Sequence, residues 1–269
     1  MSPLLGDSRM DMGRLSKSIN KIAQEHSGQG HLGIAIEWKE QFFFLNERDV
    51  FPSASLIKVP IMIEGFMQSL SGTLELDELI RVDNIRKAGG AGIVQYMSPQ
   101  SYLSIGDLLT SMIIVSDNMA TNYLIERLGL ESINSRCQQL GMSNTVLQRK
   151  MMDQQARERK LDNYTSPLDI IRCLKAIQKD KNQSAKRILS NQQLLDKLPY
   201  YLGENRSIRI ANKTGELDKV EHDCAIIEYE DEIIYVAVLT DQLPTNQKGK
   251  EIIQLIGASI FECISDKKV

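Results

Sequence analysis

The feature that most constrains the fold of this chain is the position of its strand-forming segments. β-rich segments occur near both ends, whereas apolar residues recur at helical spacing between Ser55 and about Leu202. The segments expected to form strands are Gly33–Trp38, Phe42–Asn46, Ile208–Asn212, Cys224–Tyr229 and Ile233–Leu239. Short polar turns separate neighbouring segments, so we expect antiparallel pairing and one sheet built from both ends of the chain.

Helical patterns at the two ends complete this plan. Met12–His26 and Thr245–Ile264 carry apolar residues on one face and are expected to cover the sheet. The 269 residues then divide into a sheet-containing lobe, residues 1–50 and 205–269, and an inserted all-helical lobe, residues 51–204. A cleft between two lobes is a favoured position for a small-molecule site, so we expect the active site there.

The charge balance excludes several function classes. The chain has 32 Lys and Arg against 35 Asp and Glu, a formal charge of −3, and no block of like charge. Phosphate contacts need clustered basic residues, so we expect no nucleic-acid partner. The chain lacks an apolar run of about 18 residues, which predicts no membrane span. Residues 1–17 lack the pattern of a signal peptide, so the protein either acts in the cytoplasm or is exported and has lost its signal, and the compartment stays open.

The cysteines and histidines limit the available chemistry further. Four cysteines are widely spaced without a CxxC pattern, and we expect free thiols in or near the core: Cys137, Cys173, Cys224 and Cys263. The three histidines form no HExxH pattern, so the sequence offers few of the residues that a zinc site or a Ser-His-Asp triad needs. P-loop, GxGxxG and GxSxG patterns are also missing, and we expect neither a metal nor a cofactor.

The first candidate motif is Ser55-Leu-Ile-Lys58, which places a hydroxyl and an amine one helical turn apart. The serine is expected near a helix N-terminus, where unpaired backbone N–H groups favour developing negative charge. A lysine amine can activate a serine if burial or nearby positive charge lowers its pKa. The same spacing occurs at Ser18–Lys21 and Ser265–Lys268, but those pairs lie in polar terminal helices and are expected to face solvent.

The second motif, Ser116-Asp117-Asn118, occurs once, between two apolar helical segments. These residue types are preferred helix N-caps, so the motif either caps the second helix or carries chemistry. In the second case Ser116 offers a hydroxyl for proton transfer and Asn118 an amide for substrate binding, while Asp117 holds the turn.

The third motif, Lys213-Thr214-Gly215, also occurs once, at the end of the β-rich segment 208–212. It is either a plain strand end with a turn glycine or a cationic, hydroxyl-bearing strand edge. Such an edge can pair with an extended substrate and bind its carboxylate, and the glycine would let the substrate approach closely.

The three motifs together, in this order, form the set found in class A β-lactamases and penicillin-binding proteins, and the chain resembles the class A branch. The flanking stretches Gly90–Met97 and Leu108–Ile125 support the likeness, which extends from about Gly33 to Thr240. The resemblance implies an α+β fold of the β-lactamase/transpeptidase type, an α/β sandwich with an antiparallel sheet plus an all-α lobe. It implies a serine hydrolase whose site lies between the lobes and needs no metal.

The resemblance also implies roles for residues that match the motifs. Ser55 looks like the acylated nucleophile and Lys58 like its proton partner and possible base. Ser116 and Lys213 would complete a proton and electrostatic network. A second group of residues would bind the substrate. Asn118 would bind the substrate amide, Thr214 would bind its carboxylate, and Gly215 would let it approach closely. The backbone N–H groups of Ser55 and Glu216 would form an oxyanion hole.

The chain departs from the family at deacylation. Class A enzymes activate the deacylating water with a glutamate in an ExxLN pattern that follows an arginine. No such pattern follows Arg149, and the position two residues on is Met151, which cannot take a proton. Asp153 and Glu158 are the nearest carboxylates, and the spacing favours neither.

Three functions therefore stay open from sequence. The first is a β-lactamase-like serine hydrolase that deacylates by another route. The second is a penicillin-binding, D-Ala-D-Ala peptidase-like or esterase-like protein with slow or no β-lactam turnover, and the third is a sensor that keeps the pocket. In each case we expect a monomer that binds a small molecule, a β-lactam or an acyl-D-Ala-type amide or ester.

Overall fold

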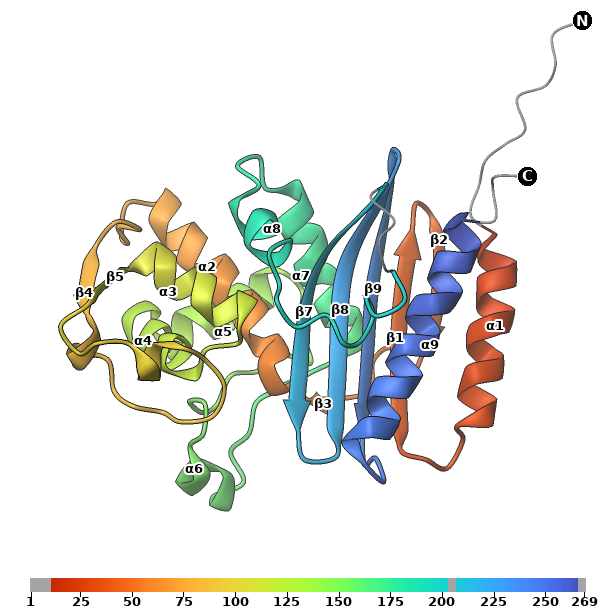
Figure 1. The fold of residues 1–269 in the computed structure, drawn as a ribbon, viewed down its shortest axis with the longest axis horizontal. Coiled ribbons are helices and arrows are strands. Elements are labelled where there is room, and N and C mark those ends of the chain that lie inside the picture. The colour runs from red at the N-terminus through yellow and green to blue at the C-terminus, as the bar shows by residue number, and fades with distance from the viewer. Residues whose placement is uncertain (1–10, 203–206, 266–269) are drawn as a thin grey trace, which may run out of the picture.

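The computed structural model describes residues 11–202 and 207–265 and consists of one central sheet with helices on both faces (Figure 1). The sheet contains β1 (His31–Trp38), β2 (Gln41–Leu45), β7 (Ile208–Leu217), β8 (Val220–Tyr229) and β9 (Glu232–Asp241). Their order is β2-β1-β9-β8-β7, and every neighbouring pair is antiparallel. The predicted joining of both chain ends in one antiparallel sheet is thus confirmed, because β1 pairs with β9.

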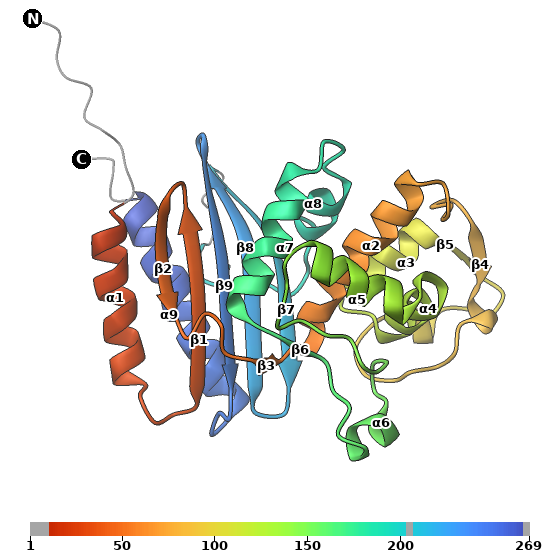
Figure 2. The same ribbon diagram turned by 180° about the vertical axis from the view of Figure 1, so that it is seen from behind.

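The helices of the described residues fall into two groups. Two terminal helices, α1 (Met12–Glu25) and α9 (Asn246–Ser265), lie side by side on one face of the sheet (Figures 1 and 2). The others are α2 (Lys58–Leu70), α3 (Ile105–Ile114), α4 (Asn118–Leu128), α5 (Leu130–Gln139), α6 (Gln154–Glu158), α7 (Pro167–Lys179) and α8 (Ser184–Leu189). Of these, α7 packs on the opposite face of the sheet against β1 and β9, and it links the sheet to the helical part of the molecule.

Burial of apolar side chains produces one core on each face of the sheet. On the face covered by α1 and α9, Leu15, Ile19 and Ile256 are fully buried and contact Trp38. The larger core joins the opposite face of the sheet to α2, α3, α4 and α7. The α+β class predicted from the sequence is therefore the observed one.

The region between the sheet segments is less uniformly helical than its spacing predicts. Two short strands, β4 (Leu79–Arg81) and β5 (Tyr102–Ser104), pair with each other, and β3 (Phe51–Pro52) pairs with β6 (Tyr164–Thr165). Between β4 and β5 the chain contains only short 3₁₀ turns, η2 (Val82–Asn84) and η3 (Val94–Tyr96). Positive φ angles at the glycines of this stretch exclude a continuous helix there.

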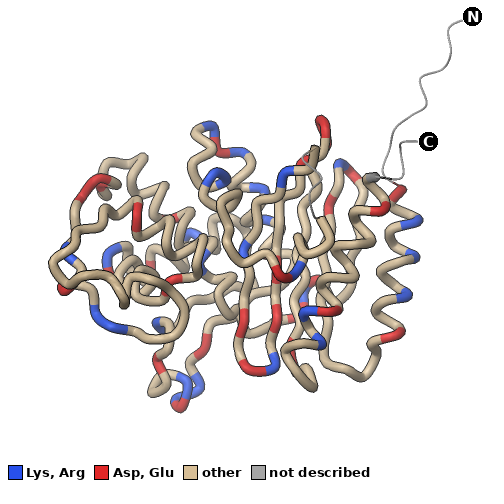
Figure 3. The backbone as a smooth tube through the Cα atoms, in the orientation of Figure 1, with Lys and Arg blue, Asp and Glu red and all other residues tan. Residues whose placement is uncertain are grey.

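The surface carries both signs of charge. Lys and Arg are interspersed with Asp and Glu along the described chain (Figure 3). No helix among residues 11–202 and 207–265 is long and apolar enough to cross a membrane. All four cysteines are buried, as the sequence predicts.

Candidate active site

Ser55 lies at the start of a helix and on the wall of a cavity. The 3₁₀ turn η1 (Ala54–Ile57) runs directly into α2, and Ser55 occupies its second position. Leu56 and Ile57 are fully buried, so the apolar half of the turn anchors it while the serine side chain stays half-buried. The expected position of this serine near a helix N-terminus is confirmed.

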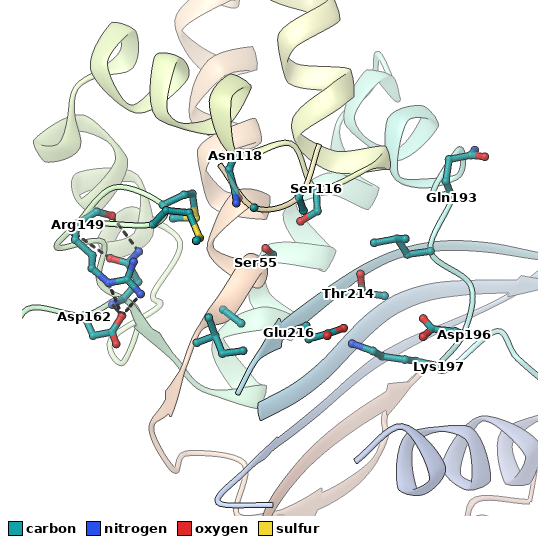
Figure 4. Close-up of a pocket in the computed structure, with 18 of the residues that line it drawn as sticks. Ser55, Ser116, Asn118, Arg149, Asp162, Gln193, Asp196, Lys197, Thr214 and Glu216 are labelled. Atoms are coloured by element: carbon teal, nitrogen blue, oxygen red, sulfur yellow. Dashed lines mark hydrogen bonds and ion pairs between the residues drawn. The ribbon is translucent and has the colours of Figure 1, made fainter. Parts of the chain in front are cut away.

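The cavity has a volume of about 580 Å³, and residues distant in sequence line it (Figure 4). Five residues singled out by the sequence motifs are among them: Ser55, Ser116, Asn118, Thr214 and Glu216. Lys58 and Lys213 lie behind this wall with no exposed surface. The structure therefore brings the three motifs together around one cavity.

Lys58 is held by three acceptors. Its Nζ donates to the carbonyl oxygen of Ser116 at 2.7 Å, to Ser116 Oγ at 3.0 Å and to Asn118 Oδ1 at 2.9 Å. Burial, followed by the charge of Lys213, lowers the pKa of Lys58 well below its ordinary value. A neutral amine has two N–H donors and one lone pair, so deprotonated Lys58 donates in two of these contacts and can accept the proton of the Ser116 hydroxyl in the third.

Lys213 approaches the same hydroxyl from the strand side. Its Nζ donates to Ser116 Oγ at 3.1 Å and to the carbonyl oxygen of Thr214 at 2.7 Å. Burial lowers its pKa to about 7. Ser116 Oγ thus lies between two lysine amines, which is an arrangement able to move a proton between them.

The Ser116-Asp117-Asn118 turn is held rigidly. Asp117 caps α4 by accepting from Ala120 N at 2.9 Å, and its other carboxylate oxygen accepts from Ile93 N and Val94 N at 2.7 and 2.8 Å. Ser116 has a φ of 56°, which is unfavourable for a residue with a side chain. The predicted helix cap is therefore confirmed at Asp117, while Ser116 and Asn118 line the cavity and their chemical roles stay a prediction.

The third motif lies inside a strand and not at its end, which corrects the sequence interpretation. β7 continues through the motif to Leu217 and is an edge strand of the sheet. Lys213 and Thr214 are buried within it, so the ladder extends beyond the apolar segment that suggested the strand.

Gly215 also allows a close contact inside the protein, besides the close substrate approach that stays a prediction. A Cβ atom at this position would lie 3.1 Å from Ala54 Cβ and 3.3 Å from His222 Cβ. The missing side chain therefore lets the Ser55 turn pack closely against β7, and this packing sets the distance between the serine and the strand edge.

The loop opposite β7 contains Arg149, Met151 and Asp162 on the cavity wall. Arg149 and Asp162 close its base with an ion pair at 2.6 Å, and Met151 lines the cavity with 9% of its surface exposed. Asp153 caps the short helix α6 and Glu158 is exposed, and neither lines the cavity. The structure therefore gives neither of these carboxylates a position as a replacement base.

Several charged residues of the site carry no motif and were missed. Lys197 lines the cavity, is 1% exposed and pairs with the buried Glu221 of β8. Next to it Asp223 is fully buried, and burial raises its pKa to about 7. The run Glu-His-Asp at the start of β8 is a signal for this cluster, because charged residues directly before an apolar strand segment need buried partners.

His222, one of the three histidines, has a structural role. The ring of the fully buried His222 lies 2.7 Å from the carbonyl oxygen of Pro52, and burial lowers its pKa to about 4. Among the described residues, no group of three or more His, Cys, Asp or Glu side chains could hold a metal ion.

The other SxxK spacings differ from Ser55 in position. Lys21 faces solvent as expected, whereas Ser18 is half-buried and its Oγ lies 2.8 Å from Ser259 Oγ in the contact between α1 and α9. Ser265 ends α9, and its partner Lys268 lies outside the described residues.

Comparisons with known proteins agree with this arrangement. The family described as "Beta-lactamase enzyme family" matches residues 14–264. A β-lactamase from Sphaerobacter thermophilus has a similar structure, with a TM-score of 0.87 and 27% identity over 95% of this chain and 98% of that one. The protein PBP-A is similar at a TM-score of 0.81 and 26% identity, over 93% of this chain and 96% of that one.

A leucine-to-glutamate mutant of PBP-A, solved as its acyl-enzyme complex with penicillin G, matches at a TM-score of 0.82 and 25% identity. That match covers 95% of this chain and 97% of the other. No curated protein sequence matches this chain.

Proposed function

Because the chain belongs to the beta-lactamase enzyme family, we propose that it is a serine hydrolase that opens a β-lactam amide through an acyl-enzyme on Ser55. The observation that carries this proposal is the convergence of Ser55, Lys58, Ser116 and Lys213 at one cavity, with both lysines buried and their pKa values lowered. A hydroxyl nucleophile needs a neighbouring base, and a desolvated lysine supplies one.

In the proposed reaction Ser55 Oγ forms a bond to the lactam carbonyl carbon and gives up its proton to the lysine network. The oxyanion accepts hydrogen bonds from the backbone N–H groups of Ser55 and Glu216. The C–N bond of the ring then breaks, and the nitrogen leaves with a proton delivered through Ser116. Lys58 and Lys213 both contact Ser116 Oγ, so the hydroxyl can be reprotonated after each transfer.

Asn118 and Thr214 are proposed to bind the substrate. Asn118 is held by Lys58 at its oxygen and by the carbonyl oxygen of Gly89 at its Nδ2, 3.2 Å away, so its amide is fixed before the substrate arrives. Thr214 lies on the edge strand and lines the cavity, where its hydroxyl can receive a carboxylate. We infer that residues 51–204 form one lobe and residues 1–50 with 205–269 the other, since the cavity takes lining residues from 51–204 and from 205–269.

A second candidate function is that of a penicillin-binding protein, in which Ser55 is acylated and the acyl group is released slowly. Met151 favours it, because this side chain lines the cavity where the family has a general base and cannot activate water. The similarity to PBP-A agrees with this alternative, since a mutant of that protein is known as an acyl-enzyme complex with penicillin G.

One experiment separates the two functions. The protein is mixed with a chromogenic cephalosporin and with a labelled penicillin, and turnover and intact mass are followed together. Sustained hydrolysis supports the β-lactamase, whereas a stoichiometric burst with a lasting adduct on Ser55 supports the penicillin-binding protein. Ser55→Ala is the control, and a wild-type protein that forms no adduct and behaves like this variant contradicts both.

A further inference from the structure

The peptide unit that joins Gly215 to Glu216 is held on one side by a buried lysine. Lys197 Nζ donates to the carbonyl oxygen of Gly215 at 2.8 Å and to that of His222 at 3.2 Å. Its third partner is the carboxylate of Glu221. These three acceptors use all three donors of an ammonium group, so Lys197 acts on the strand and not directly on a substrate.

The geometry of this peptide fixes the direction of the next N–H group. A trans peptide is planar, and its carbonyl and N–H point in opposite directions. Gly215 and His222 are partners across β7 and β8, and Lys197 touches both carbonyls, so the Gly215 oxygen faces β8. The N–H of Glu216, in the same peptide unit, therefore faces the open edge of β7, on the side of the cavity.

We propose that Lys197 is a positioning residue for the oxyanion hole, which orients and polarises the Gly215–Glu216 peptide from behind. This inference rests on the proposed function, in which the Glu216 N–H stabilises the oxyanion. A cation that binds an amide oxygen withdraws electron density from the amide and strengthens its N–H as a donor. Lys197 would thus favour the transition state, where negative charge develops, more than the bound substrate.

The surroundings of Lys197 hold it in this position. Glu221 has no exposed surface, and its other oxygen accepts from Asn246 Nδ2 at 2.9 Å. The next residue, Leu198, donates its N–H to Asp223 at 3.0 Å, which ties the chain after Lys197 to β8. The lysine is therefore fixed by its counter-charge and by its own backbone.

The test removes the cation without leaving an unpaired buried charge. In the double variant Lys197→Met with Glu221→Gln both charges are lost, and the glutamine oxygen keeps the bond to Asn246. The acylation rate constant at saturating labelled penicillin is expected to fall about 10-fold, less than for outright loss of an oxyanion donor. The dissociation constant of the complex before acylation is expected to change less than the rate.

Infrared difference spectra of the acyl-enzyme supply a readout that a general structural defect would not move. A weaker oxyanion hole raises the stretching frequency of the ester carbonyl on Ser55. Lys250→Met is the matched control, since the ion-pair partners of Lys250 among the described residues are side-chain carboxylates, those of Asp196 and Glu216, and it should leave this frequency unchanged. A folded double variant with the wild-type frequency and acylation rate overturns the inference.

The single variant Lys197→Arg provides a second measurement. A guanidinium can donate to both carbonyl oxygens, so the frequency is expected to stay closer to wild type than in the double variant. If both variants raise the frequency equally, the cation is not what polarises the peptide. If the wild-type protein forms no adduct on Ser55 with any probe, the proposed function fails instead, so the two failures can be told apart.

Discussion

Lys58 and Lys213 donate to the same oxygen, Ser116 Oγ, at 3.0 and 3.1 Å. Two full positive charges on one buried hydroxyl would repel each other and lose their hydration, so burial favours the neutral amines. Burial is the main cause of the lowered pKa of each lysine, to which the charge of Lys213 adds for Lys58 and the charge of Lys197 for Lys213. The hydroxyl between them is the group that can connect a base near Ser55 with the strand side of the cavity.

The first prediction concerns the pH dependence of stability. The pKa of Lys213 is about 7 in the folded protein, against an ordinary value of 10.5, so between these values only the unfolded chain binds the proton. Stability should therefore rise with pH above about 7, by up to about 1.4 kcal/mol per pH unit. Denaturant unfolding from pH 6 to 8.5 measures this slope. Lys213→Met should reduce it, and an unchanged slope would mean that Lys213 stays protonated.

The second prediction identifies which SxxK serine reacts. Ser55→Ala should abolish adduct formation with labelled penicillin, whereas Ser18→Ala should leave it unchanged. Ser18→Ala should still lower the free energy of unfolding by about 1 kcal/mol, because it removes the hydrogen bond to Ser259 between α1 and α9. Intact mass spectrometry and denaturant unfolding check the two effects. Ser265→Ala should also keep full adduct formation, and a large loss from either control contradicts the assignment to Ser55.

The third prediction concerns deacylation. Met151→Glu would place a carboxylate on the cavity wall, and release of the penicillin adduct should accelerate at least about 100-fold, the lower range of general base catalysis. Leu161→Glu is the control, since this residue of the same loop is 38% exposed and does not line the cavity. Release is timed by the loss of adduct mass after excess penicillin is removed. Equal acceleration by both variants would point to a general loosening of the loop.

The fourth prediction concerns the contact between the serine turn and the strand. Gly215→Ala should slow acylation about 10-fold or more, because the new Cβ would meet Ala54 Cβ at 3.1 Å and displace the turn. The second variant Ala54→Gly removes that Cβ and also suits the positive φ of 46° at residue 54. Acylation in the double variant should recover toward wild type. No recovery would mean that the strand, and not this contact, is disturbed.

The local pattern of the sequence determined the class of fold and the membership of the site. Period-two and helical spacings depend on which face of an element is buried, so they predicted the terminal helices and the joined sheet. The pairing of Ser55 with Lys58 could also be predicted, because residues three positions apart lie one helical turn apart and this requires only local geometry. The extent of β7 was missed because Lys213 and Thr214 are polar, and only their partners in the fold make them compatible with a buried strand.

The tertiary structure alone decided which charges are satisfied and where they act. Lys197 carries no motif, and its role depends on Gly215, His222 and Glu221, which come together only when β7 pairs with β8. The pKa values of the lysines likewise depend on burial, which is a property of the packed molecule and not of spacing along the chain. The sequence thus determined which groups are present, and the packing decided their protonation and direction.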